Sequence, residues 1–401
     1  MKQSESTDLL RQSAAESRSA ADARLDAEPE SAAFGTSAIR ISADGSRFPK
    51  ALYLLRTAGL LLLTIVLLFL LQRLLMPKYM GKVVEGSFTE EYYERPMDHD
   101  VLILGDCEVY ENISPVTLWR EYGISSYIRG NAQQLLPQSY AMLEEALSYE
   151  TPQAVILSVS AMQQYDQENE AYNRMTLDGM RWSVSKWNAI RKTALEDEHM
   201  IEYIFPLLRF HSRFSELEAD DLRYFWKKAR VSYNGYYLRA DVRPLGDLPS
   251  DRRPRSYAFD DRSWTCLDRI RELCEAHGIR LILMKAPSLY PAWYDQWDEQ
   301  ITAYAEQYGL EYVNCIAAAD AIGIDYETDT YDGGLHMNVS GAEKMSRYFG
   351  QLLSEEMSVP DRRGSSAELD AWWEAVCENY DAEKAAQSEE FARLGYLSRY
   401  Q

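Results

Sequence analysis

The residues best suited to covalent chemistry lie in two short segments more than two hundred positions apart. The first is the run Val101-Leu-Ile-Leu-Gly-Asp-Cys107, an apolar strand that ends in a tight turn and presents a thiol. The second is Asp332-Gly-Gly-Leu-His336, which places a carboxylate and an imidazole on one loop. A nucleophile, a histidine and an acid that orients the histidine together catalyse acyl transfer through a covalent intermediate. The two segments therefore predict a nucleophile–histidine–acid site.

The neighbours of Cys107 decide whether its thiol can react. A cysteine attacks as a thiolate, so its pKa of about 8.5 must be lowered by positive neighbours or a helix N-terminus. Asp106 and Glu108 flank Cys107, and their negative charges raise the thiol pKa unless they point away. Either His336 pairs with the thiolate, or the site keeps its geometry for binding and has lost turnover. A third alternative is a cysteine that is simply part of the core.

His336 stands out among the five histidines because a carboxylate precedes it on the same loop and an asparagine follows it. The other four lack such a setting: His99, His199, His211 and His277. The structural alternative is a loop histidine that hydrogen-bonds to backbone groups. Asn338-Val-Ser340 also matches a glycosylation sequon, but Ser340 is better explained as a helix cap.

The elements that must position these residues alternate between short strands and amphipathic helices. Strands are predicted at Val101–Leu104, Ser126–Ile128, Ala154–Val159, Leu281–Lys285 and Glu311–Asn314. Crossover helices between such strands predict a parallel sheet with helices on both faces, in a three-layer, flavodoxin-like α/β fold. These folds place their sites at the carboxyl ends of strands. Cys107 and the loop of His336 both lie at such positions.

Helix boundaries are marked by capping residues. Ser114 is a predicted N-cap, followed by Pro115 at the first position of the helix, and Gly123 ends that helix. A capping box at Ser340-Gly-Ala-Glu343 predicts a helix that runs to about Met357. Further helices are predicted at Pro137–Tyr149, Trp264–Ala276, Trp293–Tyr308 and Ala367–Leu394.

The N-terminal part of the chain has two predicted segments. Residues 1–50 are rich in serine, alanine and charged residues, which predicts a disordered tail. Residues 51–76 are leucine-rich, and Arg56 and Arg73 bracket an uncharged centre. Because arginines can extend to the headgroups, the segment is long enough to be a transmembrane signal anchor, and no cleavage site follows it. A slight excess of basic residues before it predicts a cytoplasmic tail and an extracytoplasmic C-terminal domain. The alternative is a buried helix of a globular domain.

The rest of the chain divides into a split α/β domain and two additions. The α/β domain is predicted at 77–162 and 263–358. Residues 163–262 form a helical, aromatic-rich insert, and residues 359–401 are a polar linker and a C-terminal helix. We expect the insert to cover the active site and select a polymer; alternatively, its aromatic residues only build a core of its own.

Charge and cysteine content exclude several classes of protein. The net charge of −21 argues against nucleic-acid binding. Five cysteines without a CxxC pair give neither a zinc signature nor a disulfide framework. We expect no metal and no organic cofactor, because the sequence shows no cluster of ligand residues and Gly105-Asp-Cys-Glu108 is not a phosphate-binding loop.

The ordered set Gly105-Asp106-Cys107, Gly130-Asn131 and Asp332…His336 resembles the SGNH/GDSL hydrolase superfamily. Within it, the set is most similar to membrane-anchored members that act on cell-envelope polymers, namely alginate O-acetylation proteins and the D-alanyl transfer protein of teichoic acid. The resemblance implies acyl transfer or ester hydrolysis on a cell-wall polymer or exported polysaccharide. It also implies a multi-pass membrane O-acyltransferase as partner. The alternative is a catalytically inactive polysaccharide-binding or scaffold protein on the same fold.

The resemblance assigns a role to each residue. Cys107 takes the place of the nucleophilic serine, His336 is the general base, and Asp332 orients it, with Asp329 as a less favoured acid. The backbone N–H groups of Cys107 and Gly130 are expected oxyanion donors, and the side chain of Asn131, Gln133 or Gln134 could add an amide. Gln133, Lys285 and Asn338 are expected substrate contacts.

Two features depart from the family pattern. Ser158-Val-Ser160 replaces the usual Gly-x-Asn block, and one extra residue separates Asp332 from His336, where two glycines can absorb it.

Overall fold

The computed structural model describes residues 50–78, 84–94, 98–226, 231–249 and 253–400. The chain divides into two compact units, residues 1–63 and 64–401. The α/β domain, the insert and the C-terminal helix all belong to the second unit. The tail predicted at residues 1–50 lies outside the described residues except for Lys50.

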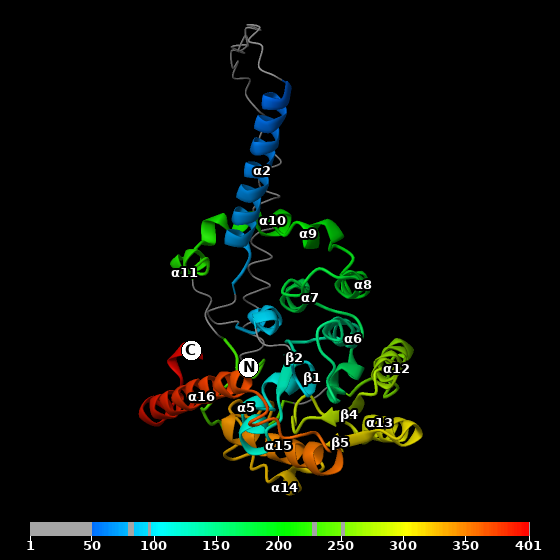
Figure 1. Cartoon of the computed structure of the whole chain (residues 1–401). Coiled ribbons are helices and arrows are strands. Elements are labelled where there is room, and N and C mark those ends of the chain that lie inside the picture. The colour runs from blue at the N-terminus through cyan, green and yellow to red at the C-terminus, as the bar shows by residue number, and fades with distance from the viewer. Residues whose placement is uncertain (1–49, 79–83, 95–97, 227–230, 250–252, 401) are drawn as a thin grey trace, which may run out of the picture. The chain divides into compact units, whose positions relative to one another are not determined.

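The centre of the second unit is a five-stranded parallel sheet (Figure 1). Its strands are β1 (Val101–Gly105), β2 (Ser126–Gly130), β3 (Ala154–Ser158), β4 (Arg280–Lys285) and β5 (Glu311–Asn314). They lie in the order β2-β1-β3-β4-β5, which is the flavodoxin-like order. All five predicted strands are present, and the predicted fold class is confirmed.

Alternate residues of β1 enter two separate hydrophobic cores, because successive side chains of a strand point to opposite faces. Val101 and Ile103 pack on one face, and Leu102 and Leu104 on the other. The first face is covered by α5 (Pro115–Tyr122), α15 (Val339–Gln351) and α16 (Ala367–Leu394). The second is covered by α6 (Leu136–Ala146), α12 (Asp261–Ala276) and α13 (Asp295–Tyr308). The fold therefore has three layers, and β1 is paired on both sides, with β2 and β3.

Local capping explains the bounds of α5 and corrects the prediction for α15. Ser114 Oγ accepts a hydrogen bond from Thr117 N at 3.3 Å, and Gly123 ends α5 with a φ of 70°. The predicted cap at Ser340 is wrong, because α15 begins at Val339 and its N-cap is Asn338. A single wider turn, Leu352–Glu356, continues this helix toward Met357.

Short helices lie in the first part of the insert. They are α7 (Glu170–Leu177), α8 (Val184–Thr193), α9 (Met200–Ile204), α10 (Leu207–Phe210) and α11 (Ala219–Arg223). α8 packs against α6, and α7 packs against the short helix α3 (Phe88–Glu91). At the other end of the chain, Trp373 of α16 stacks on Trp119 of α5, with ring centroids 5.1 Å apart.

Helix α2 (Lys50–Leu75) contains the predicted anchor. Its stretch Leu52–Leu75 is long and apolar enough to cross a membrane, by length and composition. None of the residues in the most apolar part of this stretch is buried. The helix thus meets the requirement for a membrane anchor, whereas the side of the membrane that the domain occupies stays a prediction.

Candidate active site

Cys107 lies at the carboxyl edge of the sheet, where β1 turns into the short helix α4 (Cys107–Tyr110). The turn needs glycine, because a Cβ on Gly105 would lie 2.6 Å from Ser158 Cβ. Asp106 is the N-cap of α4, and its carboxylate accepts a hydrogen bond from Glu108 N at 3.1 Å. This local geometry presents the half-buried Cys107 at the strand end predicted from the sequence.

The loop of His336 brings its imidazole to the acid predicted to orient it. His336 Nδ1 lies 2.7 Å from Asp332 Oδ2. The other oxygen, Asp332 Oδ1, accepts from the backbone N–H of His336 at 2.8 Å. Gly333 and Gly334 have φ values of 86° and 99°, so both adopt the left-handed conformation that the extra residue requires. Asp329 is bound instead by Lys344 Nζ at 2.6 Å and is not the partner of His336.

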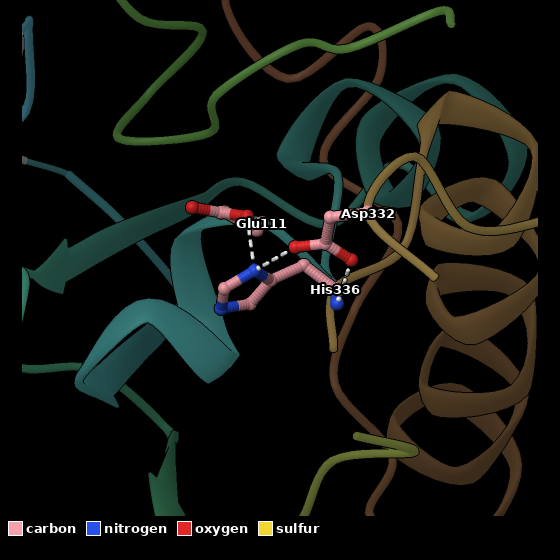
Figure 2. A group of neighbouring side chains, drawn as sticks. All are labelled: Glu111, Asp332 and His336. Carbon is pink, nitrogen blue, oxygen red and sulfur yellow. Dashed lines mark hydrogen bonds and ion pairs between the residues drawn. The ribbon is translucent and has the colours of Figure 1, made fainter. Parts of the chain in front are cut away.

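A second carboxylate, from Glu111, contacts the same imidazole nitrogen. Glu111 Oε2 lies 3.0 Å from His336 Nδ1 (Figure 2). Glu111 is buried and also accepts the hydroxyl hydrogen bond of Tyr331. This residue was not identified from the sequence. Its position four residues after Cys107 was the available signal, because residues four apart share one face of a helix.

The acids around His336 govern its charge. Burial lowers the pKa of His336, but Glu111, Cys107 and Asp332 together raise it well above its ordinary value. Burial raises the pKa of Asp332, yet the hydrogen bond and charge of His336 bring it below its usual range. Burial raises the pKa of Glu111. The acids around His336 therefore favour its protonated form.

Burial and His336 have opposite effects on the thiol of Cys107. Burial raises the pKa of Cys107 to about 12, and Asp106 adds to this rise, while His336 opposes it. The side chains of Cys107 and His336 are close enough to act on each other's pKa, although His336 Nε2 forms no hydrogen bond of regular geometry with any described residue. Burial thus favours the neutral thiol, His336 favours the thiolate, and the ion pair considered from the sequence stays a prediction.

Glu108, the other acid beside Cys107, points away into a buried ion pair. Its Oε1 lies 2.5 Å from Lys285 Nζ, and Lys285 also donates to the carbonyl of Ala286 at 3.1 Å. Lys285 is fully buried. The expectation that Lys285 contacts substrate is corrected, because its side chain joins the end of β4 to α4 beneath the site.

Two other predicted contacts are also occupied by structural hydrogen bonds. Asn131 is fully buried, and its amide donates to the carbonyl of Met175 at 3.1 Å. Asn338 Oδ1 accepts from Ser340 N at 2.9 Å, and its amide donates to the carbonyl of Thr328 at 2.8 Å. The expected roles of Asn131 as an oxyanion donor through its side chain and of Asn338 as a substrate contact are therefore corrected.

The residues at the end of β2 differ in whether their side chains are buried or face solvent. A Cβ on Gly130 would lie 2.5 Å from Val109 Cγ2, so this glycine permits close approach to the turn of Cys107. Gln134 is buried and donates to the carbonyl of Arg129 at 3.0 Å. Gln133 is exposed and has a φ of 51°. Of the two glutamines, only Gln133 presents its side chain to solvent at this strand end.

The last part of the insert reaches the site loop, whereas its helices contact α3 and α6. The Arg239 guanidinium lies over the Tyr331 ring at 4.1 Å, and Tyr331 in turn stacks against His336. Arg243 N donates to the carbonyl of Thr330 at 2.9 Å. The extended segment near Arg239 thus borders the site, and the role of the insert in selecting substrate stays a prediction.

Glu111, Asp332 and His336 offer ligand atoms that all lie within 4.8 Å of one another. Carboxylate oxygen and imidazole nitrogen are ligands for zinc and similar cations. The distances of 2.7 Å and 3.0 Å from His336 Nδ1 are those of charge-assisted hydrogen bonds. A proton on Nδ1 that both carboxylates contact therefore explains why the three side chains lie together.

Comparison with known proteins gives structural neighbours only. No family model matches the chain, and no curated protein matches it. A structure named as a lipolytic protein of the G-D-S-L family, from Desulfitobacterium hafniense, aligns with 64% of this chain and 99% of its own, at 13% identity and a TM-score of 0.34. A GDSL-like lipase from Bacteroides thetaiotaomicron aligns with 68% of this chain and 99% of its own, at 12% identity and a TM-score of 0.32. Similarity at this level adds nothing about activity, which must be argued from the site.

Proposed function

We propose that this protein transfers or hydrolyses an acyl ester through Cys107. The observation that carries the proposal is the position of Cys107 at the carboxyl end of β1, beside a His336 whose Nδ1 is held by Asp332 at 2.7 Å. These are the roles of nucleophile, base and orienting acid, supplied from distant parts of the chain.

The reaction requires His336 to lose one proton first. Neutral Nε2 then accepts the thiol proton as Sγ forms a bond to the ester carbonyl carbon, and the carbonyl oxygen becomes an oxyanion. In the proposal, the backbone N–H groups of Cys107 and Gly130 stabilise this charge. Collapse breaks the ester C–O bond, and Nε2 returns the proton to the leaving alcohol. A hydroxyl of water or polymer then attacks the thioester by the reverse sequence.

The substrate class and location are the less direct part of the proposal. Helix α2 is long and apolar enough to cross a membrane, and basic residues are slightly in excess before it. Together with the family resemblance, this supports an anchored, extracytoplasmic enzyme that acts on a cell-envelope or exported polysaccharide. A multi-pass O-acyltransferase that supplies the acyl group fits the same arrangement.

A covalent adduct is the direct test. The full chain in detergent is incubated with p-nitrophenyl acetate over a range of alkaline pH, and its intact mass is measured. We expect one acetyl group on the wild type and none on Cys107→Ala. Cys266→Ala is the matched control, since Cys266 is buried in the core. An adduct that persists in Cys107→Ala would exclude Cys107 as the nucleophile.

A second candidate function is favoured by the electrostatics of the resting site. The thiol is poorly activated, since burial raises the pKa of Cys107 to about 12. The same groups could hold a polysaccharide without turnover. Polysaccharide binding by wild type and Cys107→Ala alike, with no adduct at any pH, would favour this binding function.

A further inference from the structure

Helices α9, α10 and α11, with the turns beside them, expose a set of large apolar side chains. These are Ile201, Ile204, Phe205, Leu208, Phe214, Leu222 and Trp226, which we call the apolar face. Phe214 is 71% exposed and Trp226 is 82% exposed. Large apolar side chains that gather on the surface mark a site of contact with a protein or a membrane.

The first four members of the apolar face lie on two short helices and the residue between them. Ile201 and Ile204 belong to α9, which ends at Ile204. Phe205 follows in a non-helical conformation, and Leu208 belongs to α10, which begins at Leu207. All four side chains are exposed, whereas Tyr203 and Pro206 between them are buried. The segment therefore directs its large apolar side chains outward.

Two contacts join the later part of this segment to the end of α2. Arg213 donates to the carbonyl of Leu75 at 2.7 Å. The Arg73 guanidinium lies 5.6 Å from the centre of the Phe225 ring. Residues Arg213 to Trp226 thus lie beside the end of the apolar stretch of α2, where a membrane-spanning helix leaves the hydrocarbon.

We propose that the apolar face lies in the interfacial layer of the bilayer that α2 crosses. Amphipathic helices bind there with their apolar side in the acyl boundary, and tryptophan is enriched at this depth. The proposal rests on α2 as a membrane anchor and is independent of the chemistry of Cys107. It fixes the orientation of the α/β domain on the membrane, which a single helix alone does not.

The charge of this segment determines how its contact with the membrane should depend on lipid composition. Residues 200–226 contain five acidic and three basic residues, so the segment gains nothing from anionic headgroups. Contact should depend on apolar burial and change little with salt or with the share of anionic lipid.

Photo-crosslinking in vesicles tests the proposal. The full chain is reconstituted in phosphatidylethanolamine and phosphatidylglycerol, with a photoreactive phenylalanine analogue in place of Phe205 or Phe214. Phe69, in α2, is the positive control for the anchor, and Tyr308, at the end of α13, is the negative control. We expect lipid adducts at Phe205, Phe214 and Phe69 and none at Tyr308.

Three outcomes would overturn the proposal. Lipid adducts at Phe69 without any at Phe205 and Phe214 would show that the face does not touch the bilayer. Adducts to a second copy or to another protein would assign the face to a protein interface. No lipid adduct at Phe69 would exclude the anchor, and the orientation proposed here with it.

Discussion

The carboxylate of Glu111 lies 3.0 Å from His336 Nδ1, the nitrogen that Asp332 contacts at 2.7 Å. Two acids therefore share one imidazole N–H. One acid is enough to orient a catalytic histidine. The second adds negative charge and helps to raise the pKa of His336 well above its ordinary value. Glu111 thus opposes the neutral form of His336 that a general base requires.

Replacement of Glu111 by glutamine should bring activity to lower pH. The change removes one negative charge, so the pKa of His336 falls, and each unit of decrease raises the neutral fraction about tenfold at a pH below that pKa. The rate of acyl-adduct formation, measured against pH, should rise in the wild type only on the alkaline side. In Glu111→Gln the rise should begin at lower pH.

Glu121→Gln is the matched control for that experiment. Glu121 is a surface acid that pairs with Arg347 at 2.9 Å. The same substitution there should leave the pH profile unchanged. Coincident profiles for the wild type and Glu111→Gln would show that Glu111 does not set the protonation of His336.

Asp332→Asn should abolish most of the activity while leaving the loop folded. The asparagine keeps the size of the side chain but no longer fixes the imidazole tautomer, and the expected loss in the rate of adduct formation is on the order of 10³–10⁴-fold. Asp329→Asn would show the same loss only if Asp329 were the orienting acid. Equal rates for Asp332→Asn and the wild type would leave Asp332 without a catalytic role.

The strands and their order were predictable because the signals that specify them are local. Val101–Leu104 is an apolar run bounded by turn residues, and a crossover helix follows it. The cap at Ser114 and the glycine at 123 likewise act within one turn of α5. The strand-end placement of Cys107 followed from the parallel topology.

Side-chain direction was not predictable, because it depends on contacts between distant elements. Lys285 does end β4, but it turns inward to meet Glu108, a residue 177 positions away. Ser340 and Asn338 are both good caps, but α15 begins at Val339 with Asn338 as its N-cap, and Glu343 is bound by Lys384 Nζ at 2.6 Å. The role of Glu111 was not predicted, because its contact with His336 forms only in the folded chain.

His336 should make the stability of the protein depend on pH in a definite direction. Its pKa is raised in the folded state, so its contribution is fully present below the unfolded pKa of about 6.5. The contribution is lost as pH rises through the folded pKa. Thermal unfolding of the wild type and of His336→Gln should therefore differ most at low pH and converge under alkaline conditions. A difference that grows with pH would contradict the raised pKa.

The ion pair of Lys285 and Glu108 should behave as a structural support of the site. Lys285→Met leaves a buried carboxylate without its partner, which typically costs about 3–5 kcal/mol of unfolding free energy. Lys285→Met combined with Glu108→Gln removes both charges and should recover a large part of that loss.

Thermal unfolding in detergent measures the stability of both variants. The KM of the double variant for p-nitrophenyl acetate tests separately whether Lys285 contacts substrate. If Lys285 contacted substrate, the double variant would remain stable but show a raised KM. We expect instead that its KM is unchanged, because the Lys285 side chain is fully buried beneath Cys107 and contacts Glu108 and backbone carbonyls.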